Sequence, residues 1–300
     1  MNTKIISFVN FKGGVGKTAN VVNIAACIAK NHSKRVLIID LDAQCNATYW
    51  LLKRDTWSKI KDSPHLTVGQ IFDDFIYNVA TFDFDNCVIK GVPRSEGGMS
   101  YIDGLDILPS SLNLLRIEDE LHLNKDIKAI VKILGKALKN HISDYDYVFI
   151  DCPPNVHFIT KNALYFSDYY IIPYIPDYLS LSGFRTFCQI VKKFQLQIGT
   201  IRGNPLNPRI RGIVINRFKQ VGNVFTVSIN ELLLQLTMLK RDGLVHPDSK
   251  IFIPPIRDCV GVAESSSLHQ PVIISHPKSI GAQDYAELSI NFLNYFEVLQ

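Results

Sequence analysis

The amino-acid sequence predicts an α/β protein with a doubly wound, mostly parallel sheet and helices on both of its faces. Short apolar runs alternate along the chain with longer amphipathic segments, which is the pattern of strands and helices in such a sheet. The runs are apolar at successive positions, as expected for strands that are covered on both sides. The first run leads into a glycine-rich loop and then into a helical segment, an arrangement common in this fold class.

Six of the apolar runs are predicted as strands of this sheet. In chain order they are Lys4–Val9, Arg35–Asp40, Leu105–Pro109, Tyr145–Asp151, Tyr169–Tyr174 and Ile210–Asn216. Pro271–Ser275 is a further candidate, placed at an edge because its leading proline cannot donate a ladder hydrogen bond.

Helices are predicted where apolar residues recur every three or four positions. These segments are Asn20–Lys30, Lys125–His141, Ser180–Gln197, Val224–Lys240 and Gln283–Leu299. Residues 1–300 are expected to form a single domain, since no linker or repeat interrupts the pattern. The region of about 55–104 is less regular and rich in loops, which predicts an insertion with short helices.

Composition excludes several classes of protein. No apolar run approaches the ~18 residues that span a bilayer, and the N-terminus lacks the features of a signal peptide. The six cysteines are scattered without a C-x-x-C pair, which indicates reduced thiols and no disulfide frame or zinc site. The last helical segment has no Lys or Arg after Lys278, so a membrane-surface helix is not expected. We therefore expect a cytoplasmic protein.

The glycine-rich loop, Asn10–Thr18, reads Asn-Phe-Lys-Gly-Gly-Val-Gly-Lys-Thr. Its glycines permit positive φ and close approach to an anion, and the backbone N–H groups and helix start would face phosphate oxygens. Lys17 would add a charge for the β- and γ-phosphates, and Thr18 a hydroxyl for Mg²⁺. The alternative is a glycine-rich turn with two solvated lysines, which the residue types, spacing and strand–helix context disfavour.

Three aspartates end two of the predicted strands. Asp40 and Asp42, two positions apart, point the same way at the carboxyl end of their strand, where ligands bind in open α/β sheets. Asp151 ends a second apolar strand, as in the Walker B arrangement that holds Mg²⁺ directly or through water. Any one of them alone could instead cap a helix. Three together beside a phosphate loop favour the metal site.

Several stretches together resemble the ParA/MinD family of deviant Walker A ATPases, most closely its ParA/Soj partition branch. The loop resembles K-G-G-x-G-K-T, with Lys12 as the extra lysine. Asp40–Thr48 is similar to D-x-D-P-Q-x-N-x-T with Ala43 in place of Pro, and Asp151–Pro154 to D-C-P-P. The segments that begin at Leu108 and Ile253 resemble further family motifs, so the resemblance spans nearly the whole chain.

The resemblance implies ATP and Mg²⁺ as cofactors and a slow, partner-stimulated ATP hydrolysis. The implied catalytic residues are Lys12, reaching a second subunit's nucleotide, Lys17, and Asp42, orienting the attacking water. Thr18 would bind the metal, with Asp40 and Asp151 acting through water. The implied nucleotide-binding residues are Lys12, Gly13, Gly14, Val15, Gly16, Lys17, Thr18, Ala19, Asn216, Pro254 and Pro255.

Two positions depart from the family pattern. Ala19 stands where a second Thr or Ser is common, which predicts weaker nucleotide binding without its loss. Ser265–Ser267 replaces an A-P-S triplet and makes the register of the tail uncertain.

The charge distribution is uneven. The net charge is +4, but Arg185–Arg257 holds twelve Lys or Arg and three acidic residues, a local charge of +9 that leaves −5 elsewhere. Such a segment is either an unremarkable solvated surface or a polyanion-binding face. The resemblance implies non-specific DNA binding, which needs only phosphate neutralisation. The first candidates are Arg217, Lys219 and Arg257; further candidates are Lys192, Lys193, Lys240, Arg241 and Lys250.

The function implied by the resemblance is plasmid or chromosome segregation. The protein would form a homodimer with ATP, bind DNA on the nucleoid, and respond to a ParB-like centromere-binding partner, with no membrane partner. Two alternatives remain: a MinD-like membrane-cycling ATPase and an ATPase that positions a protein cargo. An iron–sulfur reductase on the same scaffold would need paired cluster cysteines, an arrangement that the scattered cysteines do not show.

Overall fold

The computed structural model describes residues 3–95, 97–124, 126–202, 209–219 and 223–298. Seven strands form one sheet in the order β3-β2-β4-β1-β5-β6-β7, and every neighbouring pair is parallel. The strands are β1 (Lys4–Phe8), β2 (Val36–Asp40), β3 (Leu105–Leu108), β4 (Tyr147–Asp151), β5 (Tyr169–Tyr174), β6 (Ile210–Ile215) and β7 (Lys250–Phe252). The predicted α/β fold class is confirmed, and the sheet is more regular than expected.

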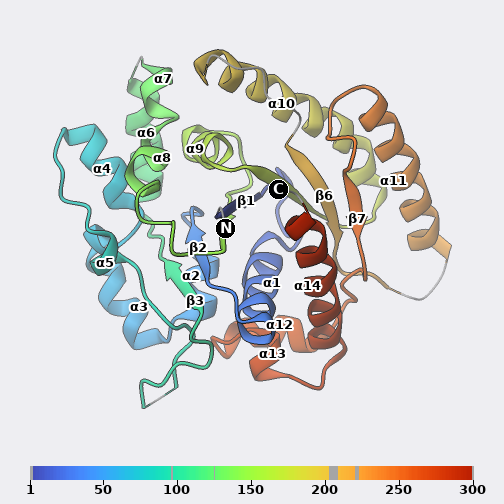
Figure 1. Ribbon diagram of the computed structural model, residues 1–300, viewed down its shortest axis with the longest axis horizontal. Helices are drawn as coiled ribbons and strands as arrows, with labels where there is room; N and C mark the ends of the chain where they lie inside the picture. Colours follow the sequence, from blue (N-terminus) through green and yellow to red (C-terminus); the bar gives the residue numbers. More distant parts are fainter. Residues whose placement is uncertain (1–2, 96, 125, 203–208, 220–222, 299–300) are drawn as a thin grey trace.

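Helices cover both faces of this sheet (Figure 1). On one face α1 packs against α14 and α13, while α8, α9, α10 and α11 lie over the other. The helices are α1 (Lys17–His32), α2 (Asn46–Leu51), α3 (Arg54–Lys61), α4 (Gly69–Tyr77), α5 (Phe84–Cys87), α6 (Leu114–Leu123), α7 (Ile127–Ile130), α8 (Ile133–Leu138), α9 (Phe158–Phe166), α10 (Tyr178–Arg202), α11 (Asn223–Arg241), α12 (Val260–Ser267), α13 (Val272–Ser275) and α14 (Ile280–Val298), with the short 3-10 helix η1 (Pro64–Leu66).

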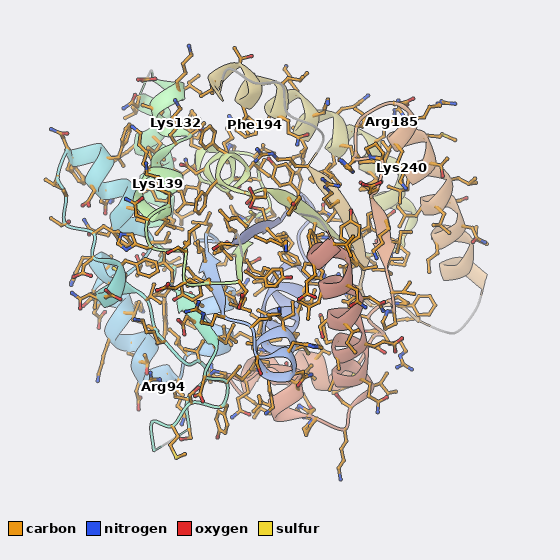
Figure 2. All side chains as sticks on the ribbon, viewed as in Figure 1. Arg94, Lys132, Lys139, Arg185, Phe194 and Lys240 are labelled. Carbon is orange, nitrogen blue, oxygen red and sulfur yellow. The ribbon has the colours of Figure 1, made fainter. Side chains whose placement is uncertain are left out.

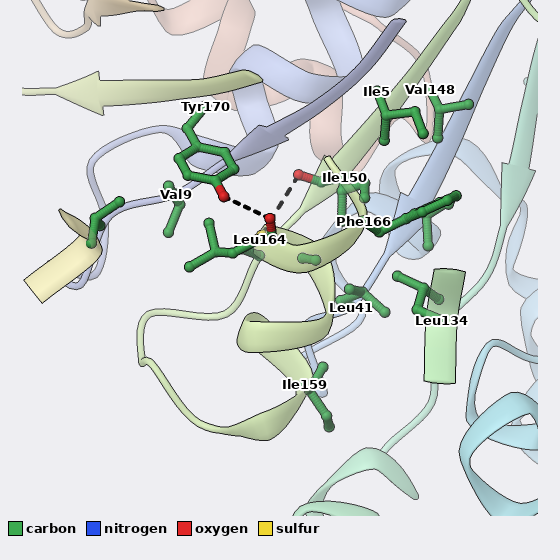
Figure 3. Close-up of a cluster of buried hydrophobic side chains, with 14 of the residues drawn as sticks. Ile5, Val9, Leu41, Leu134, Val148, Ile150, Ile159, Leu164, Phe166 and Tyr170 are labelled. Atoms are coloured by element: carbon green, nitrogen blue, oxygen red, sulfur yellow. Dashed lines mark hydrogen bonds between the residues drawn. The ribbon is translucent and has the colours of Figure 1, made fainter. Parts of the chain in front are cut away.

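Two hydrophobic cores, one on each face, hold the layers together. Successive strand residues alternate between them: Leu37 and Ile39 of β2 belong to one core, and Ile38 between them belongs to the other. Figure 3 shows part of the first core, where the buried Tyr170 hydroxyl donates to the Leu164 carbonyl at 2.6 Å. Burial on both faces explains why the strands read as continuous apolar runs.

One predicted strand is wrong. Pro271–Ser275 is not an edge strand, because Val272–Ser275 forms the helix α13 with Pro271 just before it. The Val272 amide donates to the Asn23 side chain at 2.8 Å, which fixes this segment over α1 and away from the sheet. The sheet edge next to β6 is formed instead by β7, which is only three residues long and was therefore not predicted as an apolar run.

One predicted helix is divided. Lys125–His141 contains two short helices, α7 and α8, separated by a turn at residues 131–132. The Leu134 amide at the start of α8 donates to the buried Asn162 side chain at 3.0 Å, so α9 supplies the bond that a continuous helix would have made. The outermost residues of two predictions, Lys125 and Leu299, lie outside the described residues.

None of the helices within the described ranges is long and apolar enough to cross a bilayer.

Candidate functional site

The glycine-rich loop connects β1 to α1 and is held in shape by polar contacts at both ends. The Asn10 side chain donates to the Pro173 carbonyl at 2.8 Å and accepts from the Lys12 amide at 3.0 Å. Gly16 has φ of 87°, and a β-carbon there would lie 3.0 Å from Cγ of Asn216. Only glycine fits this position, since both the left-handed backbone and the Asn216 contact exclude a side chain.

Two side chains follow the loop at the first turn of α1. Lys17 is 8% exposed, and its ammonium lies 3.4 Å from the Lys12 carbonyl. Burial lowers the pKa of Lys17 below its ordinary value. The nearby carboxylates of Asp151 and Asp42 act in the opposite direction but do not cancel this effect. The Thr18 hydroxyl donates to Oδ2 of Asp151 at 2.6 Å. The loop therefore presents a buried cation and a hydroxyl held by a strand-end carboxylate.

The strand ends bring the predicted carboxylates to the same edge of the sheet. Asp40 of β2 and Asp151 of β4 are directly paired in register, and both are fully buried. Oδ2 of Asp40 accepts hydrogen bonds from the Thr48 amide and hydroxyl at 2.9 and 2.7 Å, and its Oδ1 accepts from the Asp42 amide at 3.1 Å. Asp40 thus shapes the segment that carries Asp42, because its acceptor sites are used within that segment.

Burial of these paired carboxylates has an electrostatic cost. Burial raises the pKa of Asp40 to about 7, and the nearby carboxylate of Asp42 adds to this rise. The hydrogen bonds from Thr48 and from the Asp42 amide act in the opposite direction and lower the pKa. Burial and the neighbouring Asp40 raise the pKa of Asp151 well above its usual range. Among the described residues, Oδ1 of Asp151 is a buried oxygen without a hydrogen-bond partner. A divalent cation with its waters at this point would satisfy that oxygen and relieve the repulsion, so the residues fit the expected Mg²⁺ site.

Magnesium would not be enclosed by protein ligands alone. Across the described part of the chain, no three His, Cys, Asp or Glu side chains are grouped as a metal cluster. Thr18 would therefore bind the ion together with nucleotide phosphates, and Asp40 and Asp151 would act through water.

A cavity of about 490 Å³ opens over the loop. It is lined by Gly13, Gly14, Gly16, Lys17, Thr18, Ala19, Asp42, Gln44, Asn46, Tyr49, Trp50, Pro154, Ser266 and Ser267. The cavity therefore brings together the loop, the segment after β2, the turn after β4 and α12. Lys17 and Thr18 of the loop thus line the same cavity as Asp42.

Lys12 lies outside this cavity. Its ammonium forms an ion pair at 2.7 Å with Asp177, which lies between β5 and α10, and both side chains are about two-fifths exposed. Lys12 lines a separate pocket with Phe11, and the Phe11 ring packs edge-on against Phe187 of α10 at 4.6 Å between centroids. Phe11 occupies the position of the first glycine of an ordinary phosphate loop, and here its ring ties the loop to α10.

The predicted adenine-binding residues lie beside the loop. Asn216 is 3% exposed, and its side-chain amide donates to the Val15 carbonyl at 2.9 Å, so it supports the loop from below. As far as the described residues extend, the cavity lining includes neither Asn216 nor Pro254 and Pro255. Contact of these three residues with adenine stays a prediction.

The predicted DNA-binding residues are in different environments. Arg217 and Lys219 are 62% and 58% exposed in their side chains and approach Asp258 at 3.9 and 3.6 Å. Arg257 instead donates from Nε and Nη2 to the buried carboxylate of Asp284. The structure thus separates two exposed cations from one whose charge is already paired.

Sequence reasoning missed several residues of the site. Ser110 links two segments, since its hydroxyl donates to the Asp42 carbonyl at 2.8 Å and its amide to the Thr48 hydroxyl at 3.0 Å. The only signal was the Leu-Pro-Ser-Ser sequence after the third predicted strand. Tyr49 and Trp50 line the cavity from α2, and nothing in their spacing indicates this. Ser266 and Ser267 were noted only as a departure from the family tail.

Comparison with known proteins agrees with this geometry. A family profile described as an AAA domain matches residues 3–202, two thirds of the chain. The sporulation initiation inhibitor protein Soj of Bacillus subtilis (strain 168) is 30% identical over 291 residues, covering 95% of this chain and 96% of Soj.

The chain belongs to the ParA/MinD family of P-loop ATPases. The chromosome partitioning protein ParA of Caulobacter vibrioides (strain NA1000 / CB15N) is 26% identical, covering 95% of this ParA-type chain and 92% of that protein. Among solved structures, cobyrinic acid a,c-diamide synthase of Mycobacterium smegmatis with bound ATP analogue and magnesium has a TM-score of 0.69 at 22% identity, covering 99% of this chain and 97% of that one. The last similarity is of fold.

Proposed function

We propose that this chain is an ATP-dependent DNA-partition protein that works as a dimer. Membership of the family supports ATP hydrolysis and a role in partition. The observation that carries the dimer proposal is the position of Lys12, which is exposed beside the loop and lies outside the cavity of its own subunit. A cation so placed suits a second subunit's phosphates better than its own.

In this proposal each side chain has a distinct task. The loop amides and Lys17 hold the β- and γ-phosphates, and Thr18 holds Mg²⁺, which would neutralise phosphate charge when bound. Asp42 is 7% exposed and lines the cavity, so it can orient the attacking water. Lys12 of one subunit adds positive charge at the other subunit's γ-phosphate, where charge develops during hydrolysis.

Two matched variants test the role of Lys12. Lys12→Ala should retain ATP binding and lose turnover, because the charge donated to the second subunit is removed together with the ion pair to Asp177. Asp177→Asn should retain turnover, because it breaks that ion pair and leaves the Lys12 charge in place. If both variants lose turnover equally, the ion pair itself matters and the role of Lys12 in the second subunit is excluded. Turnover is measured as phosphate release with Mg²⁺ and ATP.

DNA binding is supported by the exposed cations Arg217 and Lys219. Non-specific binding needs only phosphate neutralisation, and no base-reading element is required. The protein would act on the nucleoid in the cytoplasm, where a ParB-like protein bound to the segregated DNA would stimulate its slow hydrolysis. Release from DNA would follow hydrolysis.

An electrophoretic shift on non-specific DNA tests this function. We expect a shift with ATP, none with ADP or without nucleotide, and a persistent shift with Asp42→Ala, which should trap the ATP-bound dimer. Identical shifts under all three nucleotide conditions would contradict a nucleotide-gated DNA binder. Flotation with liposomes provides the second arm, because ATP-dependent recruitment there would support a MinD-like membrane cycle instead.

A further inference from the structure

A groove with mostly apolar walls lies between α11 and β7, away from the nucleotide site. It has a volume of about 370 Å³. Its lining consists of Ile229, Leu233, Leu236, Thr237, Lys240, Ser249, Lys250, Ile251 and Ile253. The α11 members recur at helical spacing, so they form one stripe, and β7 forms the opposite wall. Figure 1 shows α11 and β7 next to each other at the side of the molecule opposite α4 and α5.

This surface is unusually apolar for an exposed helix. Leu233 is 47% exposed, and Ile253, just after β7, is 61% exposed. Beside the groove, Leu234 and Met238 extend the apolar surface of α11 at 63% and 48% exposure. A surface helix normally keeps such residues on its buried side, and a continuous exposed group of them marks an interaction site.

The two edges of the sheet, at β3 and at β7, differ in how other parts of the chain cover them. At β3 the edge is covered by a chain segment, because Ile89 and Ile107 exchange two backbone hydrogen bonds of 2.8 and 3.0 Å. At the β7 end, the side chains of α14 that the described residues include bond to the carbonyls on either side of the strand. Asn291 donates to Ile253 at 3.0 Å, and the Tyr295 hydroxyl donates to Asp248 at 3.1 Å. An edge strand left beside an apolar groove can accept an added strand.

The charges at the groove are positive. Lys240, labelled at the end of α11 in Figure 2, and Lys250 of β7 both line it. Neither lysine has a carboxylate partner within 4 Å in the described part of the chain. The Lys250 ammonium lies over the rings of Tyr295 and Phe252 at 4.7 and 5.1 Å, which holds it on the α14 face of β7, while Ile251 faces the groove.

We propose that this groove binds an extended, acidic segment of a partner protein, which adds to the sheet beside β7. Apolar side chains at every second position of the segment would enter the groove between Leu233 and Ile251. Asp or Glu side chains at the alternate positions would face α14 and pair with Lys250, and an acidic residue at the end of the segment would pair with Lys240.

Two other occupants fit less well. A second copy of this chain would bring the same two lysines to the interface, and like charges would oppose each other. DNA would suit the groove less well, because protein surfaces that bind DNA are polar and strongly charged. This surface instead exposes four apolar side chains: Leu233, Leu234, Met238 and Ile253.

Peptide display on the full-length protein tests the proposal. A library of random twelve-residue peptides is selected on the wild type and counter-selected on Ile253→Asp. We expect enriched sequences with alternating apolar residues and at least two acidic residues. Affinity of a selected peptide, measured by fluorescence anisotropy, should fall about tenfold with Leu233→Asp or with Thr237→Arg, which fills the groove.

The controls make the outcome decisive. Leu115→Asp on α6 changes a leucine of similar exposure, 60%, far from the groove and should leave peptide affinity unchanged. The Lys240→Glu variant should bind the acidic peptide more weakly than the wild type does. It should bind more tightly a version of the peptide with Lys in place of its acidic residues. All variants are first checked for unchanged ATP binding, which reports folding at a distant site. Absence of enriched acidic peptides, or enriched peptides indifferent to Thr237→Arg, overturns the proposal. So does a result in which Lys240→Glu only weakens retention on DNA.

Discussion

The phosphate-loop edge of the sheet and the basic C-terminal half differ in what their charged side chains do for the fold. At the loop, Lys17, which lines the cavity, is buried together with Asp40 and Asp151, and one Asp151 oxygen has no hydrogen-bond partner among the described residues. Burying these charged groups together costs folding free energy, and a bound ligand of suitable charge would offset that cost. Such an arrangement indicates function more strongly than stability.

In the basic half many cations are already paired within the fold. Arg209 is buried and donates to the Ser167 carbonyl, and Arg185 forms an ion pair with Asp242 at 2.6 Å. Arg257 is paired with Asp284. The local charge of +9 therefore overstates the charge that is free to meet a polyanion. Exposure and pairing, and not the number of cations, distinguish a binding face from a structural one.

The largest expected effect is at the loop. Lys17→Ala should lower ATP affinity by about 100-fold or more, because a buried, charge-assisted contact with phosphate is lost. Lys30→Ala, at the exposed far end of the same helix, is the matched control and should bind normally. Titration with a fluorescent ATP analogue and Mg²⁺ measures both. Near-normal affinity of Lys17→Ala would contradict the assignment of the phosphate loop.

The next effect tests the structural side of the comparison. Arg257→Ala should lower the free energy of unfolding by about 2 kcal/mol, since the buried Asp284 loses its cation. Arg217→Ala, whose side chain is exposed, should change it by less than about 0.5 kcal/mol. Chemical denaturation of both variants measures the difference. Adding Asp284→Asn to Arg257→Ala should restore part of the loss; if it does not, the pair is not the cause.

The arrangement of the glycine-rich loop and the strand-end aspartates was largely predictable because its signals are local. The glycines, Lys17 and Thr18 are neighbours in sequence, and Asp40 and Asp151 each end an apolar strand. Parallel strands place those ends together, so knowledge of the fold class was sufficient to predict their meeting. Six of the seven strands in the described chain were predicted, because burial on both faces leaves a strong apolar signal, and β7 was too short to give one.

The remaining features depend on contacts between distant parts of the chain. Asp284 lies 27 residues beyond Arg257, and Asp177 lies 165 residues beyond Lys12, so neither partner could be found from spacing. The helix α13 has the apolar composition of a strand, and its position is set by Asn23 of another element. Local pattern thus predicts elements and motifs, while pairing decides which charges remain available.

A smaller effect is expected for DNA. Arg217→Glu combined with Lys219→Glu should weaken retention on non-specific DNA several-fold and reduce its salt dependence, because two phosphate contacts are lost. Lys90→Glu is the matched control: Lys90 is 59% exposed, close to the 58% of Lys219, and likewise faces one aspartate. Filter binding across a salt series measures the slope. Equal slopes for wild type and double variant would place the DNA-binding face elsewhere.

The smallest effect concerns His246, a paired group of the basic half. Nδ1 of His246 lies 2.7 Å from the Arg211 guanidinium and accepts the Asp248 amide at 3.1 Å, so the neutral ring suits the fold. Burial, then Arg211, lowers the His246 pKa against the pull of Asp248. A lowered folded-state pKa means that stability is complete above the ordinary value of 6.5 and is lost as the pH falls through the folded value.

Thermal unfolding at pH 7, 6 and 5 checks this. The His246→Gln variant keeps a hydrogen-bond acceptor but does not titrate. On acidification the wild type should therefore lose more unfolding free energy than this variant, with a difference on the order of 1 kcal/mol. His65→Gln replaces an exposed histidine and should follow the wild type. Parallel curves for wild type and His246→Gln would mean that His246 titrates alike in the folded and unfolded chain. In that case the Arg211 guanidinium, 2.7 Å away, would not disfavour the protonated ring.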